Sequence, residues 1–145
     1  MHVDGCCLCG YLSYEAEVDP ESVLICNCRD CQVLAGSAFR VTVFVTGGFK
    51  FLSGEPSTYV KIADSGSRRA LAFCPRCGTS VYSKPADGAE GGFGLRVGSL
   101  RQRDSLTPRV QYWRRSAQSW IDHIGAIPAF DAESDEPPPQ PRSTE

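Results

Sequence analysis

The amino-acid sequence predicts a mainly β protein, built from antiparallel strands with short helical turns. Many short segments are rich in β-branched and aromatic residues, and turns that contain glycine or proline separate them. No stretch keeps an amphipathic helical period over three turns, so long helices are not expected. A run of strands without helices between them favours an antiparallel sheet.

The expected strands follow one another from residue 11 to residue 113. In residues 11–18, apolar side chains alternate with mainly polar ones, which is the period of a half-buried strand. The other strands are expected at residues 23–25, 39–45, 49–52, 58–62, 70–73, 79–82, 93–97 and 110–113. Turns are expected at residues 47–48 and 54–56. A short helix is expected at residues 30–34, and a flexible loop at residues 84–92.

The length of 145 residues is that of one ordinary domain, which we expect to span residues 1–130. Residues 131–145 contain five acids, one arginine and a run of prolines, so we expect a disordered acidic tail. This tail has a net charge of −4, which leaves +2 for residues 1–130, and a nearly neutral body argues against nucleic-acid binding. Neither a signal peptide nor a membrane-spanning apolar run is visible, so we expect a cytoplasmic protein.

Eight cysteines gather in three clusters, at residues 6–9, 26–31 and 74–77. In a reducing compartment such clusters favour metal ligands over disulfides. The segment Cys74-Pro75-Arg76-Cys77-Gly78 is typical of a zinc knuckle, in which two thiolates bind one zinc ion. A single Cys-x-x-Cys pair supplies half of a tetrahedral site, so a second pair must come from elsewhere in the chain.

Cys7 and Cys9 are expected to complete this site together with Cys74 and Cys77. Residues i and i+2 of a strand project from the same face, so both thiols can face one metal, while Cys6 points away. The result is a closed, four-thiolate structural zinc site that ties the start of the chain to a distant segment.

Cys26, Cys28 and Cys31 form the second predicted site. Three ligands leave one tetrahedral position open for water or substrate, which is typical of catalytic zinc. Two alternatives use the cysteines differently: two closed four-thiolate sites that include Cys6, or disulfides. Strand parity disfavours the first, and the poor bridging geometry of Cys-x-Cys pairs disfavours the second.

Arg29 lies inside the loop of the predicted open site, and it is the best candidate to contact a bound anion because a guanidinium matches a carboxylate. The arginines of residues 96–115 are expected on a solvated face, and the alternative is that one or two of them bind a carboxylate. His123 is expected on the surface rather than as a metal ligand. Trp113, Trp120 and Phe130 are expected in the core or in the wall of a pocket.

Several motifs, which are jointly highly specific, resemble those of one protein family. They are Gly5-Cys6-Cys7-Leu8-Cys9-Gly10 followed by Tyr14, Cys26-Asn27-Cys28-Arg29-Asp30-Cys31 with Gly36-Ser37, and Phe73-Cys74-Pro75-Arg76-Cys77-Gly78-Thr79. Gly98-Ser99-Leu100, Trp120 and Pro128-Ala129-Phe130 match landmarks further along. The family is that of the glutathione-dependent formaldehyde-activating enzymes, which includes centromere protein V. Asn27 and Gln111 stand where it usually has histidine, and Cys6 replaces a glycine.

The resemblance implies a fold of folded-over antiparallel sheets, sometimes called a β-tent, and two zinc ions per chain. It implies a structural zinc and a catalytic zinc on the two cysteine groups, which are Cys7, Cys9, Cys74 and Cys77, then Cys26, Cys28 and Cys31. The activity that it implies is the condensation of glutathione with formaldehyde to S-(hydroxymethyl)glutathione, the reverse of a carbon–sulfur lyase reaction.

Three functions are compatible with these residues. We favour a zinc-dependent carbon–sulfur lyase-type enzyme that acts on a glutathione-like thiol adduct. Three thiolates make the zinc a weak Lewis acid, so binding of a soft thiol is favoured over generation of hydroxide. The first alternative is a non-catalytic zinc-binding module for protein or chromatin partners. The second is a redox switch, in which the thiols of an empty middle cluster become oxidised.

Overall fold

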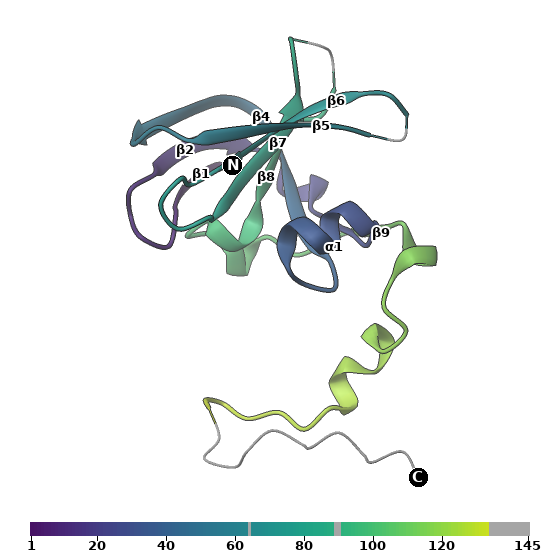
Figure 1. The fold of residues 1–145 in the computed structure, drawn as a ribbon. Coiled ribbons are helices and arrows are strands. Elements are labelled where there is room, and N and C mark those ends of the chain that lie inside the picture. Colours follow the sequence, from purple (N-terminus) through teal and green to yellow (C-terminus); the bar gives the residue numbers. More distant parts are fainter. Residues whose placement is uncertain (64, 89–90, 134–145) are drawn as a thin grey trace.

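The computed structural model describes residues 1–63, 65–88 and 91–133. Most of these residues lie in short strands, joined by turns and single-turn helices (Figure 1). The strands are β1 His2–Cys6, β2 Ser13–Val18, β3 Leu24–Cys26, β4 Arg40–Ser53, β5 Ser57–Ile62, β6 Arg68–Phe73, β7 Ser80–Pro85, β8 Gly94–Arg96 and β9 Val110–Tyr112. The helices are α1 Arg29–Ala35 and the 3₁₀ helices η1 Pro20–Ser22, η2 Val97–Ser99, η3 Arg103–Ser105, η4 Arg114–Ser116 and η5 Ile121–Ala126.

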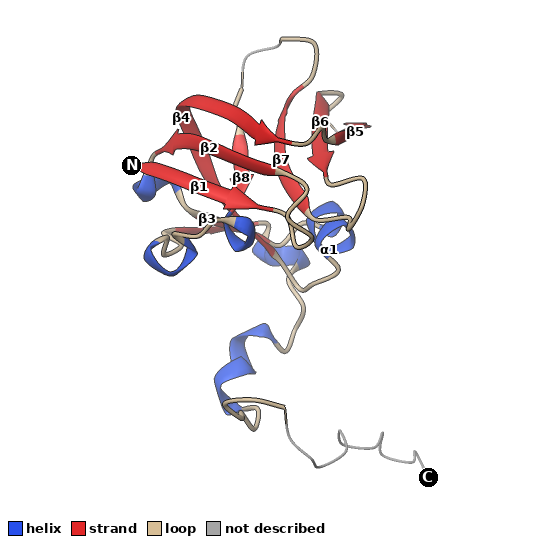
Figure 2. Ribbon diagram, turned by 90° about the vertical axis from the view of Figure 1, so that its left-hand side faces the viewer, coloured by secondary structure: helices blue, strands red, loops and turns tan. Residues whose placement is uncertain are grey.

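The strands form one sheet in the order β1-β2-β4-β8-β7-β6-β5, and β3 attaches to β4. Strand β4 belongs to both halves of this sheet, because its residues 45–53 pair with β2 while its residues 40–44 pair with β3 and β8. Figures 1 and 2 show the two halves meeting along this long strand. The prediction of a mainly β, antiparallel protein with short helical turns is confirmed. One pair departs from it, because β9 lies parallel to β3.

The predicted turn at residues 47–48 is wrong, since β4 runs through it without a break. Gly48 has a φ of 62°, and the pairing between β2 and β4 shifts register near Glu17. These are the features of a β-bulge, which bends and twists a strand without ending it. Glycine at a positive φ therefore marks an irregularity within one strand here, and not the end of one strand and the start of another.

The core lies between the two halves of the sheet, and a cluster of partly buried aromatic rings packs against it. Phe49 is surrounded by Phe51, Tyr82 and Phe93, with ring centroids 4.9–5.4 Å from its own. Strand β1, which the sequence analysis did not predict, closes one edge of this core. A Cβ on its Gly5 would lie 2.6 Å from the carbonyl oxygen of Ser99, so only glycine fits there.

Beyond β9 the chain leaves the body of the protein, and residues 117–133 extend away from the strands in both views (Figures 1 and 2). Of the two places expected for Trp120 and Phe130, the core and the wall of a pocket, the core is wrong, because both side chains are exposed. Most of the predicted tail, from residue 134 onward, lies outside the described residues, as do residues 89–90 of the predicted loop. None of the described helices has the length and apolarity needed to cross a bilayer.

Candidate metal centres

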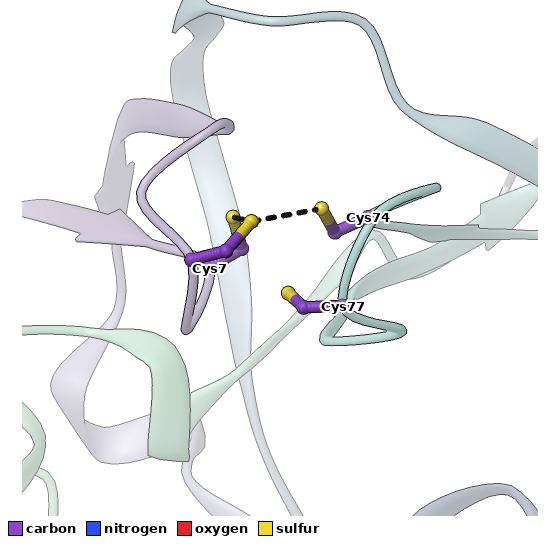
Figure 3. Close-up of side chains that lie close together, drawn as sticks. Cys7, Cys74 and Cys77 are labelled. Carbon is purple, nitrogen blue, oxygen red and sulfur yellow. Dashed lines mark hydrogen bonds between the residues drawn. The ribbon is translucent and has the colours of Figure 1, made fainter.

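The structure brings Cys7, Cys9, Cys74 and Cys77 together, with their four sulfur atoms within 4.8 Å of one another. The sulfur of Cys9 is 3.6 Å from that of Cys7 and 3.8 Å from that of Cys74. Figure 3 shows the Cys7 side chain facing those of Cys74 and Cys77 across a small gap. Zinc–sulfur bonds of about 2.3 Å in a tetrahedron place sulfurs about 3.8 Å apart, so this four-thiol cluster fits a zinc ion.

Two tight turns present the thiols of the four-thiol cluster. In the first, the amide of Gly10 donates to the carbonyl of Cys7 at 3.0 Å, and in the second the amide of Gly78 donates to that of Cys74 at 2.9 Å. Both glycines have a φ of 75°. Cys7 and Cys9 do lie together, but the argument from strand parity is wrong. Strand β1 ends at Cys6, and both thiols project from the turn after it.

The local hydrogen bonds favour thiolates at Cys77 and Cys7, but not at Cys9. The hydroxyl and the amide of Thr79 lower the pKa of Cys77 to about 5. Burial raises the pKa of Cys7, but the amide of Leu12, 3.1 Å from its sulfur, and neighbouring thiols bring it below its ordinary value. The Tyr11 amide lowers the pKa of Cys9, yet burial and the adjacent thiols outweigh this and raise it to about 11. Binding of a cation would therefore release protons from the cluster.

Cys26, Cys28 and Cys31 form a second group, the three-thiol cluster, with sulfurs again within 4.8 Å of one another. Cys26 is the last residue of β3, and Cys28 caps the N-terminus of α1, where its sulfur accepts the amide of Cys31 at 3.4 Å. The short helix predicted at residues 30–34 is confirmed. It places Cys31 one turn after Cys28, so all three thiols converge from a strand end, a cap and a helix.

The three-thiol cluster shares its negative charge. A hydrogen bond from the Cys31 thiol is the main reason why the pKa of Cys26 falls to about 5, and the charge of Arg40 lowers it further. The same hydrogen bond raises the pKa of Cys31 far above its ordinary value. Without a cation, the pair holds one thiolate and one thiol at neutral pH. A divalent metal would fit this set of soft donors, because it allows all three to be thiolates.

Asn27 fixes the loop that carries the three-thiol cluster. Its side chain is fully buried, and both its backbone amide and its Nδ2 donate to the carbonyl oxygen of Tyr112 at 3.0 Å. The Nε2 of Gln32 donates to the carbonyl oxygen of Asn27 at 2.7 Å. Asn27 therefore ties the loop to β9, whereas Gln111 is exposed on that strand.

Two pockets lie beside the three-thiol cluster. One of about 260 Å³ is lined by Cys31 and by a group of basic side chains that includes Arg40 and Arg96. The other, of about 380 Å³, is lined by Cys28, Arg29 and Trp113, among others. Lys61 and Asp30 form an ion pair and line both pockets. The four-thiol cluster also borders a hollow, since Cys77 lines a pocket of about 480 Å³.

The structure places the remaining candidates in different surroundings. Arg29 is exposed and close to Cys28, and Trp113 stands in the wall of the same pocket. His123 is exposed, and Cys6 belongs to neither cluster of the described residues. The expectation that Arg96 lies on a solvated face is wrong, because it is buried in β8. The sequence analysis missed Arg40, and it named Arg96 only within a group of arginines of which one or two could bind a carboxylate. The one signal specific to Arg96 was its position inside the short apolar strand expected at 93–97.

Two comparisons with known proteins give a match. The family model of the glutathione-dependent formaldehyde-activating enzyme matches residues 2–116. A crystal structure of a Rhodobacter sphaeroides protein from structural genomics is similar in fold, with a TM-score of 0.53 and 20% sequence identity. The alignment covers 74% of this chain and 98% of that protein. No curated protein gives a significant match.

Proposed function

Because the chain belongs to the glutathione-dependent formaldehyde-activating enzyme family, we propose that it is a zinc-dependent enzyme of the carbon–sulfur lyase type. Its substrate is a glutathione-like thiol, which it condenses with formaldehyde. The observation that carries this proposal is the three-thiol cluster, which supplies three ligands to a metal and borders two pockets that could hold a guest. A closed site without adjacent space would support only a structural role.

The proposed reaction needs no oxidant or reductant. The sulfur of the thiol forms a bond to the carbonyl carbon, the carbon–oxygen double bond becomes single, and the thiol proton ends on the new hydroxyl oxygen. A zinc ion at the cluster would lower the pKa of a thiol bound at its open position, so that the sulfur reacts as a thiolate. Cys26, Cys28 and Cys31 would hold that ion, and Asn27 would keep the loop in place through its bonds to β9.

The four-thiol cluster has a separate role in this proposal. We expect Cys7, Cys9, Cys74 and Cys77 to bind a structural zinc, since all four positions of a tetrahedron are filled by sulfur. The ion would join the turn after β1 to the turn between β6 and β7. Loss of the four-thiol cluster should therefore destabilise the fold, whereas loss of the three-thiol cluster should abolish turnover.

Replacing one ligand of the three-thiol cluster tests the proposal. Cys28→Ala should lower the zinc content from two ions to one per chain and abolish acceleration of S-(hydroxymethyl)glutathione formation over the uncatalysed rate. Formation can be followed by NMR with ¹³C-labelled formaldehyde. The melting temperature should change little, because the four-thiol cluster is intact.

The matched control is Cys6→Ala, since Cys6 is a half-buried cysteine outside both clusters. This variant should keep both zinc ions and the full rate. Undiminished acceleration by a Cys28→Ala protein that has lost one zinc would refute the enzymatic proposal and leave only a scaffold role for the metal.

A further inference from the structure

Two buried arginines beside the three-thiol cluster lack an acidic partner. Arg40 and Arg96 are only 6% and 9% exposed. The Nη1 of Arg96 donates to the hydroxyl of Thr42 at 2.8 Å, but its buried Nε has no hydrogen-bond partner among the described residues. Neither guanidinium takes part in the ion pairs formed between described residues. Even with a negative charge on the neighbouring cysteine sulfurs, two buried guanidinium groups leave a positive charge unbalanced. This is unfavourable and points to an anion that binds there.

The strands place both guanidinium groups at the same pocket. Arg40 begins β4 and lies in register with Cys26 of β3, while Arg96 ends β8 and lies in register with Thr42. Residues 40 and 42 are on the same face of β4, so Arg40 and Arg96 are diagonal neighbours on that face. Both line the pocket of about 260 Å³ that also contains Cys31.

The remaining charges of this pocket are already engaged. Lys61 forms an ion pair with Asp30. Arg69 donates to the carbonyl oxygens of Ser83 and Gly92 at 3.1 and 2.7 Å. Three arginines and one lysine face a single carboxylate among the described lining residues. Even a divalent metal on three thiolates would add only one negative charge, so the pocket would keep a net positive charge.

We infer that Arg40 and Arg96 form a carboxylate-binding subsite beside Cys31, which selects thiols that carry a carboxylate group. The planar guanidinium forks match the two oxygens of a carboxylate, and burial strengthens the contact because water cannot compete for it. The volume of the pocket equals that of about nine water molecules, enough for a carboxylate and a few carbon atoms. The inference rests on the proposed function in one respect: it takes a thiol as the guest of the three-thiol cluster.

Thiol binding to cobalt-substituted protein tests this subsite without any turnover. The probes are mercaptoacetate, which carries a carboxylate, 2-mercaptoethanol, which is neutral, and glutathione. Thiolate binding is read from the sulfur-to-cobalt charge-transfer absorption, and a dissociation constant is fitted for each probe. The variants are Arg96→Met and Arg40→Met, which keep much of the side-chain volume, and Arg96→Lys, which keeps the charge but loses the fork. Arg101→Gln is the control, since Arg101 is 72% exposed and pairs with Asp4 elsewhere.

The expected result is a loss confined to the carboxylated probes. Arg96→Met should weaken mercaptoacetate and glutathione by about tenfold to a hundredfold, the range of a buried charge-assisted contact, and 2-mercaptoethanol by less than about threefold. Arg96→Lys should recover part of the loss, and Arg101→Gln should bind all three probes like the unaltered protein. The Met variants should bind two cobalt ions, which separates the loss of a subsite from a loss of metal.

Two results would overturn the inference. In the first, Arg96→Met and Arg40→Met weaken 2-mercaptoethanol as much as mercaptoacetate, which would mean that the arginines only neutralise the metal-bound thiolates. In the second, the unaltered protein shows no arginine-dependent preference for a carboxylated thiol. The proposed function stands apart from both: arginine-dependent binding without acceleration of the glutathione–formaldehyde reaction keeps the subsite and removes the activity. Acceleration of this reaction by a protein that shows the second result keeps the activity and removes the subsite.

Discussion

Tyr14 is the residue whose burial has the clearest consequence for stability. Its ring lies in the core, and its hydroxyl is 2.6 Å from that of Ser99. Burial raises the pKa of Tyr14 to about 12, against an ordinary value of 10, although the Ser99 hydroxyl lowers it slightly. The folded state therefore holds the proton of this phenol more tightly than the unfolded state does.

The free energy of unfolding should fall between pH 10 and pH 12 because of this difference. Since the folded pKa is the raised one, the contribution of Tyr14 is fully present below pH 10 and is lost as the pH rises through 12. A shift of this size corresponds to about 2 to 3 kcal/mol. Tyr14→Phe should remove this part of the alkaline loss, as measured by urea unfolding at a series of pH values. An identical alkaline slope in both proteins would contradict the assignment.

Individual residues also mark where sequence reasoning stops. Arg96 and Arg101 are both arginines in the same stretch of chain, yet the first is buried in β8 and the second is exposed. The local pattern distinguishes them only by the apolar strand expected around Arg96, because the burial of Arg96 depends on β4 and on the pocket that β4 helps to form. Arg29 could be predicted close to the three-thiol cluster, since it shares the cysteine loop.

At the scale of elements, the loop of residues 26–28 depends on its contact with β9. Asn27 gives two hydrogen bonds to the same carbonyl oxygen of Tyr112, one from its backbone and one from its side chain. A substitution can remove the side-chain hydrogen bond but not the backbone one. Because the three-thiol cluster surrounds Asn27 in the sequence, any freedom gained by the loop reaches the thiols directly.

Asn27→Ala should lower the free energy of unfolding by about 0.5 to 1.5 kcal/mol, the net contribution of one hydrogen bond, because the backbone amide of residue 27 still satisfies the Tyr112 carbonyl. It should also weaken metal binding at the three-thiol cluster, because the loop would no longer hold Cys26 and Cys28 in place. Urea unfolding and competition with a zinc chelator measure the two effects. Gln111→Ala, a change at an exposed residue of β9, is the control and should leave both unchanged. Equal zinc affinity in both variants would show that the anchor is not needed for the site.

Most strands could be predicted from their β-branched and aromatic residues, and residues 11–18 from alternation, while the errors come from features that have no clear local signal. Strand β1 escaped prediction because residues 2–6 include Asp4 and Gly5 and lack β-branched or aromatic residues apart from Val3. Strand β4 was divided because a glycine pair is a turn signal in isolation, whereas the partner strand β2 holds it as a bulge. Pairing between distant strands, such as the parallel contact of β3 and β9, leaves no local signal at all.

At the scale of the whole molecule, the four-thiol cluster connects parts of the chain that are 65 residues apart. A metal there would link the β1–β2 hairpin to the β6–β7 hairpin, at opposite ends of the strand order. The grouping of the cysteines could be predicted from their number and spacing. Their geometry could not, because the turn that presents Cys7 and Cys9 exists only where β1 ends.

Removal of metal should therefore destabilise the entire fold. Treatment with a strong chelator should lower the melting temperature by roughly 10 °C or more, since a loss of about 3 kcal/mol has this effect in a domain of this size. Most of the drop should persist in Cys28→Ala, which keeps the four-thiol cluster, and should be absent in Cys74→Ser. Calorimetry with and without chelator measures it. The same drop in Cys74→Ser as in the unaltered protein would show that the four-thiol cluster is not the stabilising site.

The ion pair of Lys61 and Asp30 sets a limit on the shape of any guest. It is a common wall of the two pockets beside the three-thiol cluster, with Cys31 lining one and Cys28 the other. A compact molecule can occupy one pocket without breaking this ion pair. An elongated molecule that reaches from Arg96 to Trp113 must either bend around the Lys61–Asp30 ion pair or separate these two side chains. Molecular length is thus a selection criterion in addition to charge.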